Sequence, residues 1–213
     1  MREQERGKVF REACGTERVV FLDRDGTVNQ EVGFLTRVED LELIPRAAEA
    51  IRLLNRSGFR VVILSNQSGV ARGFLDEETL RAIHRALLER LEIQGARVEG
   101  IYYCPHHPEA PLAVYRRRCH CRKPETGLVR QAAQDLGIRP EGAYVVGDRL
   151  LDMELAHRIG GTGVLVLTGY GRQELARRDG RPQGEPDHVA ADLYHAAVWI
   201  LSREGKADVV GRS

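Results

Sequence analysis

The sequence predicts a doubly wound α/β domain built on a parallel β-sheet. Short, nearly continuous apolar runs rich in β-branched residues occur at residues 18–22, 60–64, 143–147 and 163–167. Runs of this kind are typical of strands that are covered on both faces. Segments with helical periodicity lie between them, and strands that alternate with helices form parallel sheets with helices on either side.

The helices are expected in order at residues 46–56, 76–94, 126–136 and 150–159. A glycine follows each of them, as is common at helix C-termini, namely Gly58, Gly95, Gly137 and Gly160. A further strand is expected at residues 98–103, and a closing helix at residues 191–202. These two elements complete the layers of the predicted domain.

Length and charge limit the classes of function. A chain of 213 residues, 42% hydrophobic, supports one well-filled core. We expect a polar N-terminal arm at residues 1–17, a single domain at 18–203 and a C-terminal tail at 204–213. With 32 Lys and Arg against 31 Asp and Glu, no overall field favours nucleic acid or an anionic membrane. No stretch is long enough to cross a bilayer, so we expect a soluble, cytoplasmic monomer that binds a small molecule.

Acidic residues follow two of the predicted strands, at the edge of the sheet where open α/β folds bind ligands. Asp23-Arg-Asp25-Gly-Thr27 follows the first strand, and Gly147-Asp148 begins a segment that reaches Asp152. Two aspartates separated by one residue repel each other unless a divalent cation lies between them. An oxygen-only ligand set suits Mg²⁺ better than zinc or copper.

A simpler interpretation of Asp-x-Asp-Gly-Thr is a turn with a helix cap, because Asp, Gly and Thr all favour turns. Two further residues argue for phosphate chemistry instead. The hydroxyl of Ser65 and the ammonium of Lys123 are the groups needed to hold phosphate oxygens beside carboxylates.

Together and in order, these residues resemble the four motifs of the haloacid dehalogenase (HAD) phosphatases. The resemblance implies that Asp23 attacks phosphorus to form an aspartyl phosphate, while Asp25 protonates the leaving oxygen and then activates water. Mg²⁺ would bind Asp23, the Asp25 carbonyl and Asp148, with Asp152 as a candidate further ligand. Metal-bound Asp23 would stay ionised, whereas the Asp25 carboxyl would remain free to exchange protons.

Three of the four cysteines lie in one loop with a histidine. Cys104, His106, Cys119 and Cys121 supply the three thiolates and the imidazole of a closed, structural zinc site. Free buried cysteines and a disulfide are the alternatives. A zinc ion here would order the loop and hold Lys123, two residues beyond the last ligand, at the phosphate. Cys14, alone in the N-terminal arm, has no assigned role.

The gaps between the motifs leave no room for a cap domain, so loops around the open site must select the substrate. The zinc loop ending in Cys-Arg-Lys-Pro and the segment from Asn66 to Gly73 resemble the D-glycero-D-manno-heptose 1,7-bisphosphate 7-phosphatase family. The resemblance implies removal of the C7 phosphate of a heptose bisphosphate, a step toward nucleotide-activated heptose for surface glycans. It also implies that Arg122 binds the substrate and that the backbone around Asn66 holds the phosphate. Arg72 is a candidate for the distal phosphate.

Three rival functions remain open at this point. A histidinol-phosphate phosphatase shares the capless core and a similar zinc loop. A polynucleotide 3′-phosphatase shares the core, but the balanced charge argues against it. An inactive zinc-stapled binding module would normally have lost a nucleophile or a metal ligand, and none is missing here. Ser65 stands where the family commonly has Thr, which keeps the hydroxyl. The preferred anomer of the heptose stays open.

Overall fold

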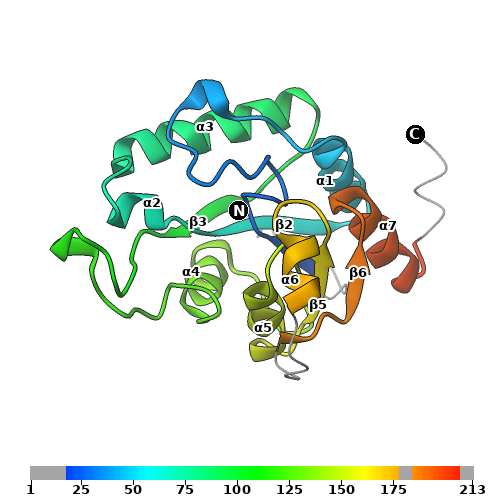
Figure 1. The fold of residues 1–213 in the computed structure, drawn as a ribbon. Helices are drawn as coiled ribbons and strands as arrows, with labels where there is room; N and C mark the ends of the chain where they lie inside the picture. The colour runs from blue at the N-terminus through cyan, green and yellow to red at the C-terminus, as the bar shows by residue number, and fades with distance from the viewer. Residues whose placement is uncertain (1–17, 178–183, 207–213) are drawn as a thin grey trace, which may run out of the picture.

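The computed structural model describes residues 18–177 and 184–206 (Figure 1). In this part of the chain six parallel strands form one sheet in the order β3-β2-β1-β4-β5-β6. The predicted doubly wound fold is therefore confirmed. The strands are β1 (Arg18–Leu22), β2 (Phe59–Asn66), β3 (Gly100–Cys104), β4 (Tyr144–Gly147), β5 (Thr162–Val166) and β6 (His188–Ala190).

Helices cover both faces of the sheet (Figure 1). Successive side chains of a strand point to opposite faces of the sheet. The side chains of β1 therefore pack alternately into two hydrophobic cores, one on each face. Val20 and Leu22 pack in the core beneath α1 (Ala47–Arg56), α3 (Glu77–Ile93) and α7 (Leu193–Arg203). Val19 and Phe21 pack in the core beneath α4 (Gly127–Leu136) and α5 (Leu150–Arg158). This burial on both faces explains why the strand sequences are apolar throughout.

The predicted elements all occur, with bounds that differ by at most two residues. Sequence patterns missed several short elements: α2 (Ser68–Ala71), α6 (Gly171–Arg177), β6 and the 3₁₀ turns η1 (Val38–Asp40) and η2 (Ala113–Tyr115). These segments are too short to show a clear period. Neither gap between the motif residues contains a cap domain, as expected. No helix in the described residues is long and apolar enough to cross a membrane.

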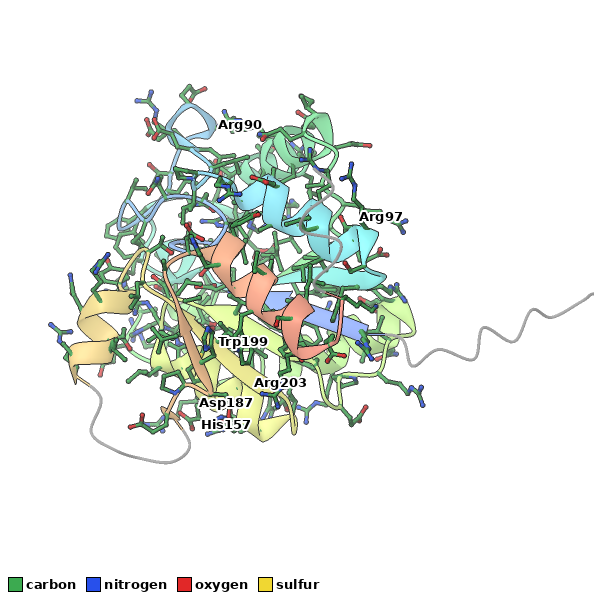
Figure 2. The ribbon with its side chains drawn as sticks, turned by 90° about the vertical axis from the view of Figure 1, so that its right-hand side faces the viewer. Arg90, Arg97, His157, Asp187, Trp199 and Arg203 are labelled. Atoms are coloured by element: carbon green, nitrogen blue, oxygen red, sulfur yellow. The ribbon has the colours of Figure 1, made fainter. Side chains whose placement is uncertain are left out.

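The edge strand β6 is held by side-chain contacts from α7 and α5 (Figure 2). The Trp199 indole of α7 stacks on the His188 ring, with ring centroids 4.2 Å apart. Asp187, just before β6, accepts a hydrogen bond from the Gly163 amide at 2.7 Å and lies 3.0 Å from Nε2 of His157. A short edge strand covered in this way offers little free backbone for pairing with another chain.

The ends of the predicted domain are only partly described. The N-terminal arm at residues 1–17 and the last seven residues of the predicted tail lie outside the described residues. Within the described start of the tail, the Tyr144 hydroxyl donates to Glu204 at 2.7 Å, and Lys206 donates to the Ser57 carbonyl. Residues 204–206 therefore pack against the domain.

The strand order places a crevice at the centre of the sheet. After β1 the chain continues to β2 and β3 on one side, whereas after β4 it continues to β5 and β6 on the other. Ligands bind at such a switch point, beyond the carboxyl ends of the two strands. Asp23 follows β1 and Asp148 follows β4, and the Asp23 amide donates to the Val146 carbonyl at 2.8 Å.

Candidate active site

Three aspartates at this switch point form an acidic cluster. Carboxylate oxygens of Asp23, Asp148 and Asp152 lie within 4.8 Å of one another, and all three residues are buried. Asp152 reaches the cluster from the first turn of α5. Burial and then the negative charge of Asp23 raise the pKa of Asp148 to about 8. The cluster is therefore costly to ionise without a cation.

Lys123 places a buried positive charge against the cluster. Its Nζ lies 2.7 Å from Asp23 Oδ1, 2.7 Å from Asp152 Oδ1 and 2.8 Å from the Leu64 carbonyl oxygen. Burial lowers the pKa of Lys123, but the two carboxylates outweigh burial and hold it above its ordinary range. An ammonium has three hydrogens to donate. Lys123 therefore donates to Asp23 and to the Leu64 carbonyl and forms an ion pair with Asp152, so it orients Asp23 as well as lining the pocket.

The remaining ligand capacity of the cluster fits a magnesium ion. Oδ1 of Asp148 and Oδ2 of Asp152 are buried and have no hydrogen-bond partner among the described residues. Three carboxylates against the one ammonium of Lys123 leave two negative charges, which one divalent cation would balance. Hard carboxylate oxygens with space for water and phosphate are the surroundings that Mg²⁺ prefers.

Gly26 passes close to this cluster, which explains the glycine of Asp-x-Asp-Gly-Thr. Its φ angle is +77°, and a Cβ at this position would lie 2.2 Å from Asp148 Oδ2. Gly169 approaches the same oxygen from another segment, and a Cβ there would also lie 2.2 Å away. A side chain at either position would displace the Asp148 carboxylate.

Replacing Gly26 by alanine should therefore weaken metal binding more than backbone strain alone explains. We expect Gly26→Ala to lower the affinity for Mg²⁺ by about tenfold or more, because the carboxylate must move. Gly142→Ala is the matched control, since Gly142 has a φ of +74° but nothing within 4 Å of an added Cβ. Mg²⁺ titrations of activity and urea unfolding compare the two variants. Equal effects of both on Mg²⁺ affinity would contradict the role of close approach.

Asp25 lies beside the cluster, and its carboxylate is held from several sides. Arg24 Nη2 lies 2.7 Å from Oδ1 and 2.8 Å from Oδ2, while Asn29 Nδ2 donates to Oδ1 at 2.9 Å. Gln67 Nε2 donates to Oδ2 at 2.8 Å and to Ser65 Oγ at 2.7 Å. Burial raises the pKa of Asp25, but the Arg24 charge and these bonds outweigh it and hold the pKa below its ordinary value. The Asp25 carboxylate is thus oriented by Arg24, Asn29 and Gln67, and its part in proton transfer stays a prediction.

The loop from Cys104 to Lys123 brings the four predicted zinc ligands together. The three sulfur atoms of Cys104, Cys119 and Cys121 lie 3.2 to 3.4 Å apart, and His106 Nδ1 lies 3.4 Å from the Cys121 sulfur. None of the three cysteines forms a disulfide. A tetrahedral zinc ion with Zn–S bonds of about 2.3 Å separates its sulfur ligands by roughly 3.8 Å. The cluster is close to this size, so its residues fit a structural zinc ion.

The zinc loop leads directly to Lys123, whose backbone is also held by Asn66. The Lys123 amide donates to Asn66 Oδ1 at 3.0 Å, and Asn66 Nδ2 donates to the Lys123 carbonyl at 3.1 Å. The Asn66 side chain is thus used to position Lys123. The phosphate contact expected of the backbone around Asn66 stays a prediction.

A pocket lies over Asp23 and brings together most of the predicted residues. The predicted catalytic and substrate residues that line it are Asp23, Asp25, Ser65, Asn66, Arg122 and Lys123. Arg72 does not line it, and instead lies exposed at the end of α2. Its contact with the distal phosphate of the substrate stays a prediction. Arg149 and Tyr170 also line the pocket.

Known proteins resemble the chain over most of its length. A HAD-hydrolase-like family model matches residues 120–196. The chain is 42% identical over 189 residues to a D-glycero-D-manno-heptose-1,7-bisphosphate 7-phosphatase of Thermosynechococcus vestitus. The matched region covers 86% of this chain and 95% of that protein. The chain belongs to this heptose bisphosphate phosphatase family.

Other members of the heptose bisphosphate phosphatase family are also similar to this chain over most of its length. The D-glycero-beta-D-manno-heptose-1,7-bisphosphate 7-phosphatase of Escherichia coli is 40% identical over 184 residues, covering 86% of this chain and 87% of that protein. A crystal structure of the D,D-heptose 1.7-bisphosphate phosphatase from B. bronchiseptica contains magnesium and phosphate. It matches with a TM-score of 0.76 and 36% identity, covering 87% of this chain and 99% of that one. The predicted family resemblance is confirmed.

Sequence reasoning missed the buried polar residues that surround Asp25. Arg24 and Gln67 stand inside quoted motifs, but nothing in their spacing showed that both contact Asp25. Asn29 and His84 lie outside the motifs. His84 carried one signal, because it falls between the apolar residues Ile83 and Leu87 on the buried side of a helix. A polar residue on such a face needs a partner.

Proposed function

We propose that this chain is a Mg²⁺-dependent phosphohydrolase that removes the C7 phosphate of D-glycero-D-manno-heptose 1,7-bisphosphate. The observation that carries the proposal is the buried contact between Lys123 and Asp23 at the floor of a pocket, beside two further carboxylates. This arrangement supplies a nucleophile, a counter-charge and metal ligands at one point. Membership of the heptose bisphosphate phosphatase family supports the substrate.

Asp23 is the proposed nucleophile. Asp23 lines the pocket and its Oδ1 accepts a hydrogen bond from Lys123, so the carboxylate is held in orientation before substrate binds. Attack on phosphorus forms an acyl phosphate on Asp23 as the bond to the sugar oxygen breaks. Water then attacks this phosphorus and frees the Asp23 carboxylate.

Asp25 is the proposed acid and base of the two steps. The negative charge of a bound phosphate would favour the protonated form of Asp25, which could then give its proton to the departing sugar oxygen. The carboxylate left behind would take a proton from the attacking water in the second step. Ser65 Oγ accepts a hydrogen bond from Gln67, which leaves its own hydrogen free to donate to a phosphate oxygen. The two side chains therefore act on opposite ends of the bond that breaks.

Asp23, Asp148 and the Asp25 carbonyl are the proposed magnesium ligands, with Asp152 as a further candidate. When bound, Mg²⁺ would neutralise the acidic cluster and the charge on the transferring phosphate. Lys123 holds Asp152 and Asp23 in place from the opposite side. The oxygens of Asp148 and Asp152 without partners are those available to the ion or its waters.

Arg122 is the proposed contact for the part of the substrate beyond the reacting phosphate. It lines the pocket, and its Nη1 is held by the His106 carbonyl at 3.2 Å, within the zinc loop. The zinc loop thereby positions two cations, Arg122 and Lys123, with different tasks. Arg72, exposed at the end of α2, is the candidate for a distal phosphate.

A comparison of phosphate esters tests the substrate. We expect kcat/KM to be highest for heptose 1,7-bisphosphate, because Arg122 can hold a second anionic group that a monophosphate lacks. The two anomers of the heptose bisphosphate and histidinol phosphate are assayed side by side with Mg²⁺. A preference for histidinol phosphate would overturn the substrate while leaving the chemistry of Asp23 in place. The anomer that reacts faster indicates which nucleotide-heptose route the product enters.

The proposal extends to the setting in which the chain works. It acts on a small phosphorylated sugar as a monomer, without nucleic acid or membrane as a partner, and in the cytoplasm. The near-zero net charge of +1 supports the small-molecule partner. Three thiolates kept reduced for zinc suit a reducing compartment. Light scattering of the purified protein checks the monomer, and a dimer mass would contradict it.

A further inference from the structure

Arg24 is a wholly buried arginine that has no role in the proposed chemistry so far. Its side chain lies between Asp25 on one side and His84 on the other. A buried guanidinium must have its donors satisfied, because each one left unpaired carries the full cost of desolvation. Arg24 meets this need with a bidentate contact to Asp25 and with Nη1, which lies 3.0 Å from His84 Nε2.

The direction of the bond between Arg24 and His84 is determined by chemistry. A guanidinium can only donate, so His84 Nε2 must accept, and the ring is the neutral tautomer with its hydrogen on Nδ1. Burial, and then the charge of Arg24, lower the pKa of His84 to about 3, which agrees with a neutral ring. His84 is therefore a fixed acceptor at neutral pH.

His84 is itself held rigidly. It lies on the buried side of α3 and is only 7% exposed. Its ring meets that of Tyr103 edge to face at 5.4 Å, and the Tyr103 hydroxyl donates to Glu77 at the start of the same helix at 2.8 Å. The imidazole thus has no freedom to leave Arg24 without opening the contact between α3 and β3.

The bidentate contact determines where the Asp25 carboxylate points. Arg24 holds both oxygens, while Asn29 and Gln67 each take one from other directions. Asp25 nevertheless lines the pocket. Without an acceptor at His84, Nη1 of Arg24 would be a buried donor with no partner. The guanidinium would then lower its energy by rotating toward another oxygen. This rotation would turn the Asp25 carboxylate with it.

We propose that His84 is a positioning residue for protonation of the leaving group, acting through Arg24 on the orientation of Asp25. The inference rests on the proposed function, because it needs Asp25 to deliver a proton to the departing oxygen. In that step the bond from phosphorus to the ester oxygen breaks, Asp23 bonds to phosphorus, and the Asp25 proton moves to the ester oxygen. His84 touches none of these atoms.

Esters with different leaving groups test this role. An alkyl ester such as heptose bisphosphate needs its oxygen protonated, whereas 4-nitrophenolate leaves without help. For His84→Phe, which removes the acceptor, we expect kcat/KM to fall by about tenfold or more on the alkyl ester and by less than about threefold on 4-nitrophenyl phosphate. The ratio kcat/KM is used because it reports the first phosphoryl transfer, not the later attack of water.

Two further variants separate positioning from structural damage. His84→Gln keeps an acceptor at nearly the same reach and should restore the alkyl ester activity to within about threefold of the original. Leu87→Ala, on the same buried side of α3, should lower stability and leave the ratio of the two activities unchanged. If His84→Phe does not fold, His84→Asn, which is too short to reach Arg24, takes its place.

The outcomes are distinct. Equal losses on both esters, no loss on either, or a His84→Gln variant as impaired as His84→Phe would each overturn the positioning role. If the unmodified protein cleaves another alkyl phosphate but not heptose bisphosphate, the proposed substrate is wrong, and the comparison is made on the ester that is cleaved. If it cleaves no phosphate ester, both proposals fall.

Discussion

Asp23→Asn should abolish turnover, with kcat lowered by about 10⁴-fold or more. The amide is a poor nucleophile, and it also loses the ion pair with Lys123. The acyl phosphate should disappear as well. Acid quenching during turnover followed by intact-protein mass spectrometry detects one added phosphoryl group on the unmodified protein and should detect none on the variant.

The loss of turnover in Asp23→Asn should not result from unfolding of the protein. Lys123 keeps its ion pair with Asp152 when Asp23 is replaced, and the repulsion by which Asp23 raises the pKa of Asp148 is removed. The stability measured in the presence of a chelator should therefore change little. Asp135→Asn is the matched control, because Asp135 is exposed on α4, away from the pocket. It should retain full activity. Substantial turnover by Asp23→Asn would rule out Asp23 as the nucleophile.

Cys121→Ser should remove zinc and lower activity by about 100-fold, the order of loss expected when catalytic groups shift by about 1 Å. Cys121 lies two residues before Lys123, and its sulfur is 3.2 Å from both other cysteine sulfurs. Without zinc, the loop that carries Arg122 and Lys123 loses its anchor. Some activity should persist, because Asn66 still holds the Lys123 backbone from β2.

Metal analysis and reconstitution check this prediction. The unmodified protein should contain one zinc per chain, and chelator-treated protein should regain full activity with zinc plus Mg²⁺ but not with Mg²⁺ alone. Cys14→Ser is the control, since Cys14 lies far along the sequence from the loop between Cys104 and Lys123, and it should keep both zinc and activity. A Cys121→Ser protein with unchanged zinc content and activity would show that the cluster does not hold the loop.

Much of the fold was predictable because buried parallel strands are apolar on both faces and the intervening helices end at glycines. Other elements form because of tertiary contacts, and the hydrophobic pattern of the sequence does not predict them. The three residues of β6 form a strand because Trp199 stacks on His188 and Asp187 accepts from the Gly163 amide. None of these contacts leaves a period in the sequence.

The candidate site divides in the same way. The sequence by itself determined which side chains meet at the switch point, because Asp23 and Asp148 directly follow adjacent strands and Ser65 lies near the carboxyl end of the neighbouring strand β2. It also determined the zinc ligand set, since Cys-x-His and Cys-x-Cys bring their members close through local geometry alone. Position at a strand end was sufficient to predict the first group of residues, and short spacing along the chain was sufficient to predict the second.

Only the tertiary structure decided how those side chains are used. Lys123 donates to Asp23 and pairs with the charge of Asp152, and Asp25 is held by Arg24, which is held in turn by His84. His84 lies 60 positions from Arg24 along the chain. The physical reason is that a buried polar group must find its partner in space, and its choice depends on helix packing that sequence spacing does not record.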